Sequence, residues 1–81
     1  MSRKKVLVYT VPDCHLCYQT TQLLQKLKVQ FDERIVSQNP EHAVEMLKKS
    51  NQTGVPVLDI DGHIVIGFSP DQIEKEIQLR K

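Results

Sequence analysis

Hydrophobic positions in the first half of the chain follow three different patterns. Residues 4–10 (KKVLVYT) are mostly β-branched or aromatic with little alternation, which is typical of a strand covered on both faces. From Cys14 to Lys28, apolar side chains recur at helical spacing and predict an amphipathic helix. The inward face of this helix contains Leu16, Thr20, Leu23, Leu24 and Leu27. Residues 29–36 (VQFDERIV) alternate and predict a second, less buried strand.

Capping and turn residues then predict a second helix and a hairpin. Asn39 is a candidate cap and Pro40 a favoured first residue for the helix. Its expected inward face contains Ala43, Val44 and Leu47. Further on, Asp61-Gly62 lies between two apolar runs in VPVLDIDGHIVI. This dipeptide favours a two-residue hairpin turn because both residues tolerate the positive φ angles that the turn requires.

A third helix completes the expected order of elements. Ser69 as cap, Pro70 as first residue and Gln72 at the third position form a capping-box pattern, and Ile73 and Ile77 share one face. The order is therefore β-α-β-α-β-β-α, an α/β fold within a single domain spanning residues 1–81. Strands joined through a helix pair in parallel and hairpin strands pair antiparallel, so we expect a four-stranded mixed sheet with helices on both faces.

Composition narrows the choice of partner and compartment. The 81 residues include 11 Lys and Arg against 10 Asp and Glu, a net charge of +1 that gives no reason to expect nucleic acid or an acidic membrane as partner. The apolar run after Arg3-Lys4-Lys5 is broken at Thr10 and Pro12, short of the roughly 7 to 15 residues of a signal peptide. We therefore expect a cytoplasmic protein, where thiols are normally kept reduced.

The chain has two cysteines, Cys14 and Cys17, which lie where the first strand runs into a helix. Their spacing predicts a Cα separation of about 5 to 6 Å, within the range that a disulfide accepts. A helix N-terminus favours the thiolate, so Cys14 is the expected nucleophile and Cys17 the resolving thiol. Asp13 is the expected N-cap. Its negative charge is expected to oppose formation of the Cys14 thiolate only weakly. His15 either stabilises the thiolate when protonated or is an exposed residue without a role.

Two other readings of the cysteine pair remain as alternatives. Structural zinc normally takes four ligands from two spaced pairs, but His15, His42 and His63 are scattered and the last two are expected to be solvated. A purely structural disulfide closing so short a loop would stabilise the fold little. A redox pair is therefore the favoured interpretation, and a metal or iron–sulfur carrier using the same cysteines is the alternative.

Three motifs, in order, resemble the glutaredoxin-like branch of the thioredoxin superfamily: CHLC (residues 14–17), TGVP (residues 53–56) and GFSPD (residues 67–71). The resemblance runs from Lys4 to about Leu79 and implies a thioredoxin-like fold. It also implies that Pro56 is cis and lies opposite the sulfurs. The Val55 backbone would then pair with a bound disulfide-carrying chain or with glutathione.

The chain departs from the resemblance at positions that bear on the electron donor. Glutaredoxins that use glutathione usually carry Lys or Arg where this chain has Val11, and a Gly-Gly-x-Asp stretch where it has residues 66–69. GFSPD is similar to the redoxins that serve ribonucleotide reductase and take electrons from thioredoxin reductase, and also to small glutaredoxin-like proteins of bacteria. Gln52 and the Ser69 helix start still offer contacts to glutathione. Glutathione therefore stays a candidate co-substrate, though not the favoured donor.

The resulting prediction is a dithiol thiol–disulfide oxidoreductase that reduces protein or glutathione mixed disulfides. The expected substrate-binding residues are Gln52, Thr53, Val55, Pro56, Phe68 and Ser69, with Asp13 and His15 tuning the pKa of Cys14. Tyr18 and Phe68 either line the rim of the site or are ordinary core or surface aromatics. No bound metal or organic cofactor is expected. The expected partners are disulfide-containing proteins, with thioredoxin reductase or glutathione as donor, and the protein is expected to be a monomer.

Overall fold

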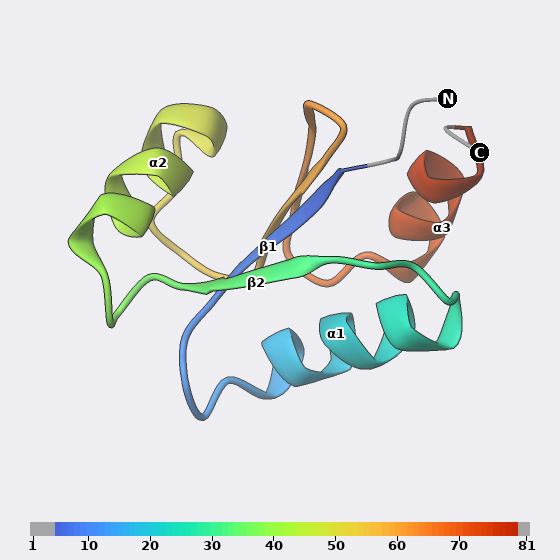
Figure 1. The fold of residues 1–81 in the computed structure, drawn as a ribbon, viewed down its shortest axis with the longest axis horizontal. Coiled ribbons are helices and arrows are strands. Elements are labelled where there is room, and N and C mark those ends of the chain that lie inside the picture. The colour runs from blue at the N-terminus through green and yellow to red at the C-terminus, as the bar shows by residue number, and fades with distance from the viewer. Residues whose placement is uncertain (1–4, 80–81) are drawn as a thin grey trace.

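Strand β1 (Val6–Thr10) is a central strand of a four-stranded sheet with the order β2-β1-β3-β4. The computed structural model describes residues 5–79, and Figure 1 shows how the strands and helices are arranged. The other elements are α1 (His15–Lys26), β2 (Asp32–Ile35), α2 (Pro40–Ser50), β3 (Val57–Ile60), β4 (His63–Ile66) and α3 (Pro70–Leu79). The predicted order β-α-β-α-β-β-α is confirmed, and residue 4 of the predicted first strand lies outside the described residues.

Strand pairing follows the predicted mixed pattern. β1 pairs in parallel with β2 and antiparallel with β3, and β3 pairs antiparallel with β4. Every residue of β1 is buried, as its unbroken apolar run predicts. The β3–β4 hairpin turns at Asp61 and Gly62, whose φ angles are 55° and 92°. The Asp-Gly turn is therefore confirmed.

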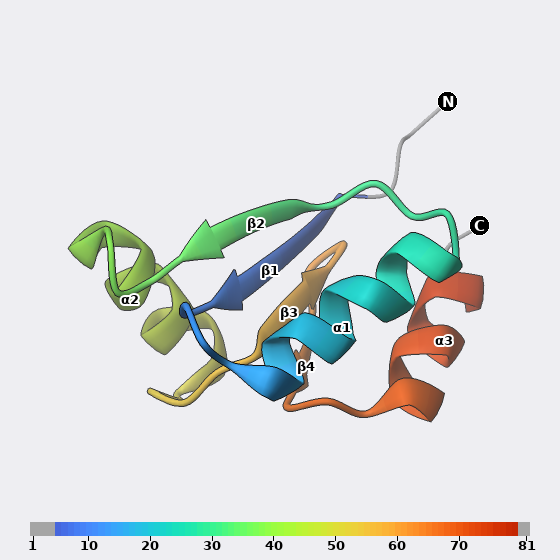
Figure 2. The ribbon, with the colours of Figure 1, turned by 90° about the horizontal axis from the view of Figure 1, so that it is seen from below.

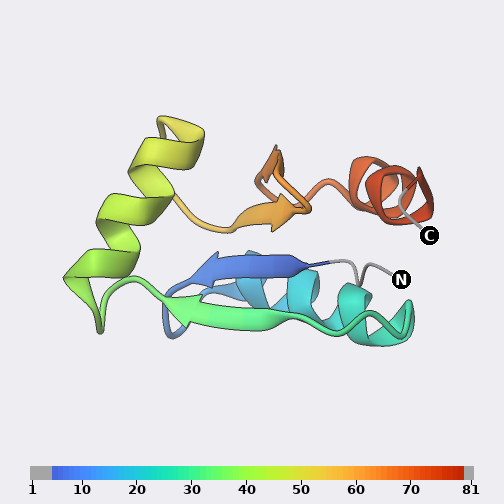
Figure 3. The same cartoon turned by 45° about the horizontal axis from the view of Figure 1, so that its top comes forward.

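The helices cover both faces of the sheet. On one face, Leu24 of α1 and Ile73 and Ile77 of α3 pack with residues of β1, β3 and β4, and Figure 2 shows these two helices next to each other. On the other face, Met46 of α2 packs with Leu7 and Tyr9 of β1 and with Val57 of β3. In Figure 3, α2 lies beside one end of the strands and α3 beside the other. The predicted mixed sheet with helices on both faces is confirmed.

Several predicted boundaries and buried positions were wrong. Helix α1 ends at Lys26, because Lys28 adopts a left-handed conformation with φ 61°. Strand β2 covers four residues rather than the predicted eight. Leu16, Val44 and Leu47, which were expected to face inward, are 47%, 51% and 44% exposed. A helix on a small sheet buries only a narrow stripe of its surface, so some of its apolar residues stay exposed. In α2 the buried position is Met46.

Polar residues join α2 to the sheet in what we call the ionic cluster: Tyr9, Arg34, Glu45, Lys49 and Asp59. Glu45 accepts hydrogen bonds from the Tyr9 hydroxyl and from Arg34. Lys49 donates to the Tyr9 hydroxyl at 2.9 Å and to Asp59 at 2.7 Å, and its ammonium lies 5.3 Å from the Tyr9 ring centroid. The buried Tyr9 hydroxyl thus has both a donor and an acceptor as partners.

The ionic cluster shifts the pKa values of three of its members. The hydrogen bond from Tyr9 is the main cause that lowers the pKa of Glu45, with Arg34 and Lys49 adding to it. Burial and the Glu45 carboxylate raise the pKa of Tyr9. Burial alone would lower the pKa of Lys49, but its bonds to Asp59 and Tyr9 outweigh burial and the net shift is upward. The charged forms of Glu45 and Lys49 are therefore favoured in the folded protein.

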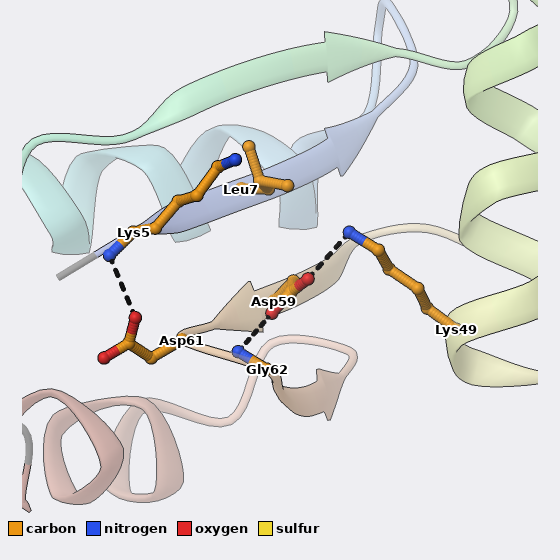
Figure 4. A pocket seen from close by; sticks show the side chains of 6 residues that line it. All are labelled: Lys5, Leu7, Lys49, Asp59, Asp61 and Gly62. Atoms are coloured by element: carbon orange, nitrogen blue, oxygen red, sulfur yellow. Dashed lines mark hydrogen bonds and ion pairs between the residues drawn. The ribbon is translucent and has the colours of Figure 1, made fainter.

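A cavity of about 170 Å³ lies where the start of β1 meets the β3–β4 turn. Figure 4 shows the bonds that line it: the Lys5 backbone N–H donates to Asp61, and Asp59 accepts from Lys49 and from the Gly62 backbone N–H at 2.7 Å. Both oxygens of Asp59 are engaged by protein donors. We interpret this cavity as a gap between hydrogen-bonded polar groups and one ion pair, which together hold the hairpin to β1 and α2.

Candidate active site

Strand directions bring three separate segments to one end of the sheet, which we call the disulfide end. Because β1 and β3 are antiparallel and Tyr9 faces Val57, the end of β1 lies beside the start of β3. Because β3 and β4 are antiparallel and Val57 faces Ile66, the end of β4 lies there too. Figures 1 and 2 both place the segment before β3 beside the loop from β1 to α1. The three motifs recognised in the sequence therefore meet at this end.

Cys14 and Cys17 form a disulfide at the start of α1, with a Cα separation of 5.2 Å that agrees with the predicted range. Cys14 is partly exposed, whereas Cys17 is buried at 3% exposure. A partner molecule therefore reaches the Cys14 sulfur more readily than the Cys17 sulfur. This difference in access is what the predicted roles of nucleophile and resolving thiol require.

The prediction that Asp13 caps α1 was wrong, because Cys14 occupies the N-cap position. Cys14 has an extended backbone (φ −104°, ψ 111°), and its Sγ accepts a hydrogen bond from the Cys17 backbone N–H at 3.1 Å. Asp13 precedes the cap in a left-handed conformation with φ 60°, which Asp adopts more readily than most residues. The helix N-terminus therefore acts directly on the Cys14 sulfur, the predicted nucleophile.

The side chains around the disulfide are largely exposed. Asp13 and His15 are exposed, and among residues 5–79 no hydrogen bond or ion pair engages either side chain. Tyr18, one residue after Cys17, is 61% exposed and is thus a surface residue near the disulfide rather than a core aromatic. The influence of Asp13 and His15 on the ionisation of Cys14 stays a prediction.

The segment before β3 brings four of the six predicted substrate-binding residues to the disulfide end: Gln52, Thr53, Val55 and Pro56. The Val55–Pro56 peptide bond is cis, as the resemblance implied. Pro56 is buried and its carbonyl accepts a hydrogen bond from the Gly67 N–H at 2.8 Å, whereas Val55 is half-buried. Within residues 5–79, no backbone hydrogen bond involves Val55. Gln52 and Thr53 are exposed next to them.

The segment after β4 reaches the same end through the bond between Gly67 and Pro56. Gly67 has φ 80°, a conformation that favours glycine. Phe68 is half-buried and packs against the core shared by α1 and α3. Ser69 accepts the Ile73 N–H through its carbonyl at 2.9 Å and so opens α3. Phe68 is therefore at least partly a core aromatic, one of the two alternatives left open for it.

One polar pair near this end was not predicted. The buried Thr10 hydroxyl, at the end of β1, donates to Glu33 of β2 at 2.8 Å. No local pattern connects residues 23 positions apart, and only the parallel pairing of β1 with β2 brings them together. The bond satisfies a buried hydroxyl four residues before Cys14.

Residues 5–79 contain neither a cluster suited to a metal ion nor a helix suited to a membrane. No group of three or more His, Cys, Asp or Glu side chains in that range is placed to hold a metal ion. His63 is exposed as predicted, but His42 is half-buried and its Nδ1 is buried without a hydrogen-bond partner, so the prediction of full solvation was wrong there. No helix within the described part of the chain is long and apolar enough to cross a membrane.

Comparison with known proteins gives a consistent result. A family model described as Glutaredoxin matches residues 6–65. A glutaredoxin-like 8.6 kDa protein in the rubredoxin operon of Clostridium pasteurianum is 34% identical over 90% of this chain and 97% of that protein. Glutaredoxin 3 of Escherichia coli K12 is 34% identical over 76% of this chain and 75% of that protein.

A solved structure is also similar. The glutaredoxin-like NrdH-redoxin from Escherichia coli superposes with a TM-score of 0.77 at 28% identity, covering 88% of this chain and 92% of that one. The fold and the Cys14–Cys17 pair, together with these relatives, define a thiol–disulfide oxidoreductase with the thioredoxin-like fold. The chain belongs to the glutaredoxin family, as the three motifs predicted.

Proposed function

We propose that this protein reduces disulfides of other proteins through Cys14 and Cys17, with thioredoxin reductase as its preferred source of electrons. The observation that carries the proposal is the disulfide at the start of α1, next to the segment that holds cis Pro56. Glutathione mixed disulfides are a second, poorer substrate. The similar NrdH-redoxin is described as having a thioredoxin-like activity profile, which supports this order of donors.

The proposed reaction moves two electrons in two exchange steps. The Cys14 thiolate attacks one sulfur of the substrate disulfide, forming a mixed disulfide and releasing the other sulfur as a thiolate that takes up a proton. Cys17 then loses its proton and attacks the Cys14 sulfur, which releases the second substrate thiol and leaves the Cys14–Cys17 disulfide. A reductase returns two electrons to this disulfide. The thiols carry all the electrons, so the mechanism needs no metal or organic cofactor.

The residues around the disulfide position the substrate in this proposal. The Val55 backbone, which has no hydrogen-bond partner within residues 5–79, pairs with the extended substrate chain beside its cysteine. Gln52 and Thr53 are exposed beside it and contact the same chain. The backbone N–H groups that follow Ser69 at the start of α3 hold a carboxylate when glutathione is the partner. Phe68 adds apolar contact at the rim.

We further propose that the protein works as a cytoplasmic monomer in electron transport and in maintaining the thiol balance of the cell. The absence of a membrane-spanning helix within residues 5–79 is compatible with this location. The cytoplasm supplies reductase and glutathione, and it keeps thiols such as Cys14 and Cys17 reduced between turnovers.

Two parallel assays test the donor and the reaction together. Reduction of a protein disulfide, such as that of insulin, is followed at fixed protein concentration with NADPH and thioredoxin reductase, and separately with NADPH, glutathione and glutathione reductase. We expect faster turnover in the first assay, and no turnover in either with Cys14→Ser. A faster glutathione assay would reverse the order of donors. Activity in neither assay, with Cys14 alkylated only above pH 8, would overturn the proposed function.

A further inference from the structure

An apolar pocket lies beside the disulfide end of the sheet, and of its lining residues only Thr53 belongs to one of the three motifs. Its volume is about 200 Å³, and its lining is apolar except for Thr53: Val36, Ala43, Val44, Met46, Leu47 and Thr53. Met46 is buried, while Val44 and Leu47 are about half exposed. Val44 and Leu47 are the α2 residues that the periodicity placed in the core and that the sheet does not cover.

The position of this pocket connects it with the reacting sulfurs. Val36 follows β2, and its N–H donates to the carbonyl of Thr10, the last residue of β1 before the loop to Cys14. Thr53 lies two residues before Val55, in the segment that leads to cis Pro56. A polypeptide held along that segment would therefore pass the mouth of the pocket within a residue or two of its cysteine.

We propose that this pocket binds an apolar side chain of the substrate polypeptide, located close to the cysteine that Cys14 attacks. This inference rests on the proposed reduction of protein disulfides and names the substrate class for it. The occupant is an aliphatic or aromatic residue, because the lining offers no charged group and one hydroxyl. Glutathione consists of γ-glutamyl, cysteinyl and glycyl groups and has no such side chain. The pocket therefore favours polypeptides over glutathione.

The residue at position 11 agrees with this preference for polypeptides over glutathione. A glutathione-holding cation is missing at that position, so a charged tripeptide gains little there. A polypeptide instead gains from burying apolar surface against Val44 and Leu47. Recognition thus shifts from charge on the loop before Cys14 to apolar contact on α2.

The test uses two short peptides that each carry one cysteine as a mixed disulfide with 2-mercaptoethanol. One has Leu two residues from the cysteine on either side, and the other has Ser at both places. With the wild-type protein and thioredoxin reductase, we expect kcat/KM to be about 10-fold higher for the Leu peptide, equivalent to about 1.4 kcal/mol. In Val44→Asp and in Leu47→Asp, this ratio of the two rates should fall close to 1.

Leu79→Asp is the matched control, since Leu79 is 66% exposed and lies at the end of α3, outside the pocket lining. It should keep the wild-type ratio, and circular dichroism checks that all variants fold. If the wild-type protein reduces neither peptide, the proposed function itself fails. If it reduces both at equal rates, or if Val44→Asp and Leu47→Asp keep the 10-fold ratio, the function stands and the pocket proposal is wrong. A third outcome would also overturn the proposal: the wild-type protein sediments as a dimer, Val44→Asp dissociates it, and the wild type shows no preference between the two peptides. The pocket would then bind a second copy of the chain.

Discussion

The disulfide end of the sheet and the ionic cluster beneath α2 differ in whether their polar side chains are bonded to other protein groups. In the ionic cluster, the Tyr9 hydroxyl, the Glu45 carboxylate and the Lys49 ammonium are each bonded to another protein group. At the disulfide end, Thr53 and His15 are exposed, and within residues 5–79 neither side chain has a partner. Paired groups resist new partners, whereas unpaired exposed groups receive them. One region therefore holds the fold together and the other is available for a substrate.

The largest expected effect separates these regions by activity. Cys14→Ser should reduce disulfide turnover to the uncatalysed rate, because serine cannot form the mixed disulfide. Cys17→Ser should still attack substrate but accumulate the mixed disulfide, which mass spectrometry detects as an adduct. Both variants, compared with the reduced wild type in urea denaturation, should unfold at nearly the same midpoint. Turnover by Cys14→Ser, or an adduct on it, would contradict the assigned roles.

The second expected effect is the reverse, a loss of stability with little change in chemistry. Lys49→Met removes the donor to the Tyr9 hydroxyl and to Asp59. We expect the free energy of unfolding to fall by about 1–2 kcal/mol, less than for a fully buried charged hydrogen bond, since the Lys49 side chain is partly exposed. Urea denaturation measures this change, and disulfide reduction should retain its wild-type rate constant.

Lys48→Met is the matched control for Lys49→Met. Lys48 is the exposed neighbour in α2, and its replacement should change stability by less than about 0.5 kcal/mol. Equal losses for the two variants would mean that the bonds of Lys49 add nothing beyond helix propensity. The ionic cluster would then not stabilise the fold through the bonds of Lys49.

The residues of the disulfide end could be predicted from the sequence, whereas those of the ionic cluster could not. The three motifs at the disulfide end each contain local signals, such as a Cys pair before a helix or Pro56 before an apolar strand, and their order places them together. The ionic cluster has no local signal, because Tyr9, Glu45 and Asp59 are 14 to 50 residues apart and meet only through the packing of α2 on the sheet. The pairing of distant polar residues depends on tertiary geometry that periodicity does not describe.

Local errors at the disulfide end have a related cause. Asp13 is a favourable capping residue by type, yet Cys14 caps α1 because the turn forces Asp13 into a left-handed conformation. Val44 and Leu47 are apolar at helical spacing, yet the narrow sheet leaves them exposed. Residue type and spacing therefore identify which elements form, but the angle and width of their contact decide which residues become free for binding.

A third prediction concerns pH. The pKa of Glu45 is lowered from its ordinary value of 4.5 in the folded protein, mainly by the hydrogen bond from Tyr9. The stabilisation from this carboxylate is present above its unfolded pKa and is lost as pH falls through its lowered folded pKa. The stability difference between wild type and Glu45→Gln should therefore be largest near pH 6, under about 1 kcal/mol for a partly exposed group, and should shrink toward pH 3. Urea midpoints across this range measure it, and a difference independent of pH would refute the assignment.

The smallest expected effect returns to the disulfide end and changes its choice of partner. Val11 is half-buried in the loop before Cys14, where glutaredoxins that use glutathione usually carry a cation. The long side chain of Val11→Lys should carry its ammonium out to solvent near a glutathione carboxylate, where such pairs contribute about 0.2–1 kcal/mol. We therefore expect kcat/KM for a glutathione mixed disulfide to rise by up to about 5-fold at low ionic strength and less at high salt, because salt screens the attraction.

Val11→Met is the control, since it adds length without charge and should leave the rate with glutathione unchanged. The Leu peptide rate should also stay at its wild-type value in Val11→Lys, because that substrate gains its contact on α2 rather than on the loop. A parallel rise for both substrates would mean that the new lysine acts on Cys14 itself, by stabilising its thiolate, and not on glutathione. The two substrates together thus separate a change in recognition from a change in the nucleophile.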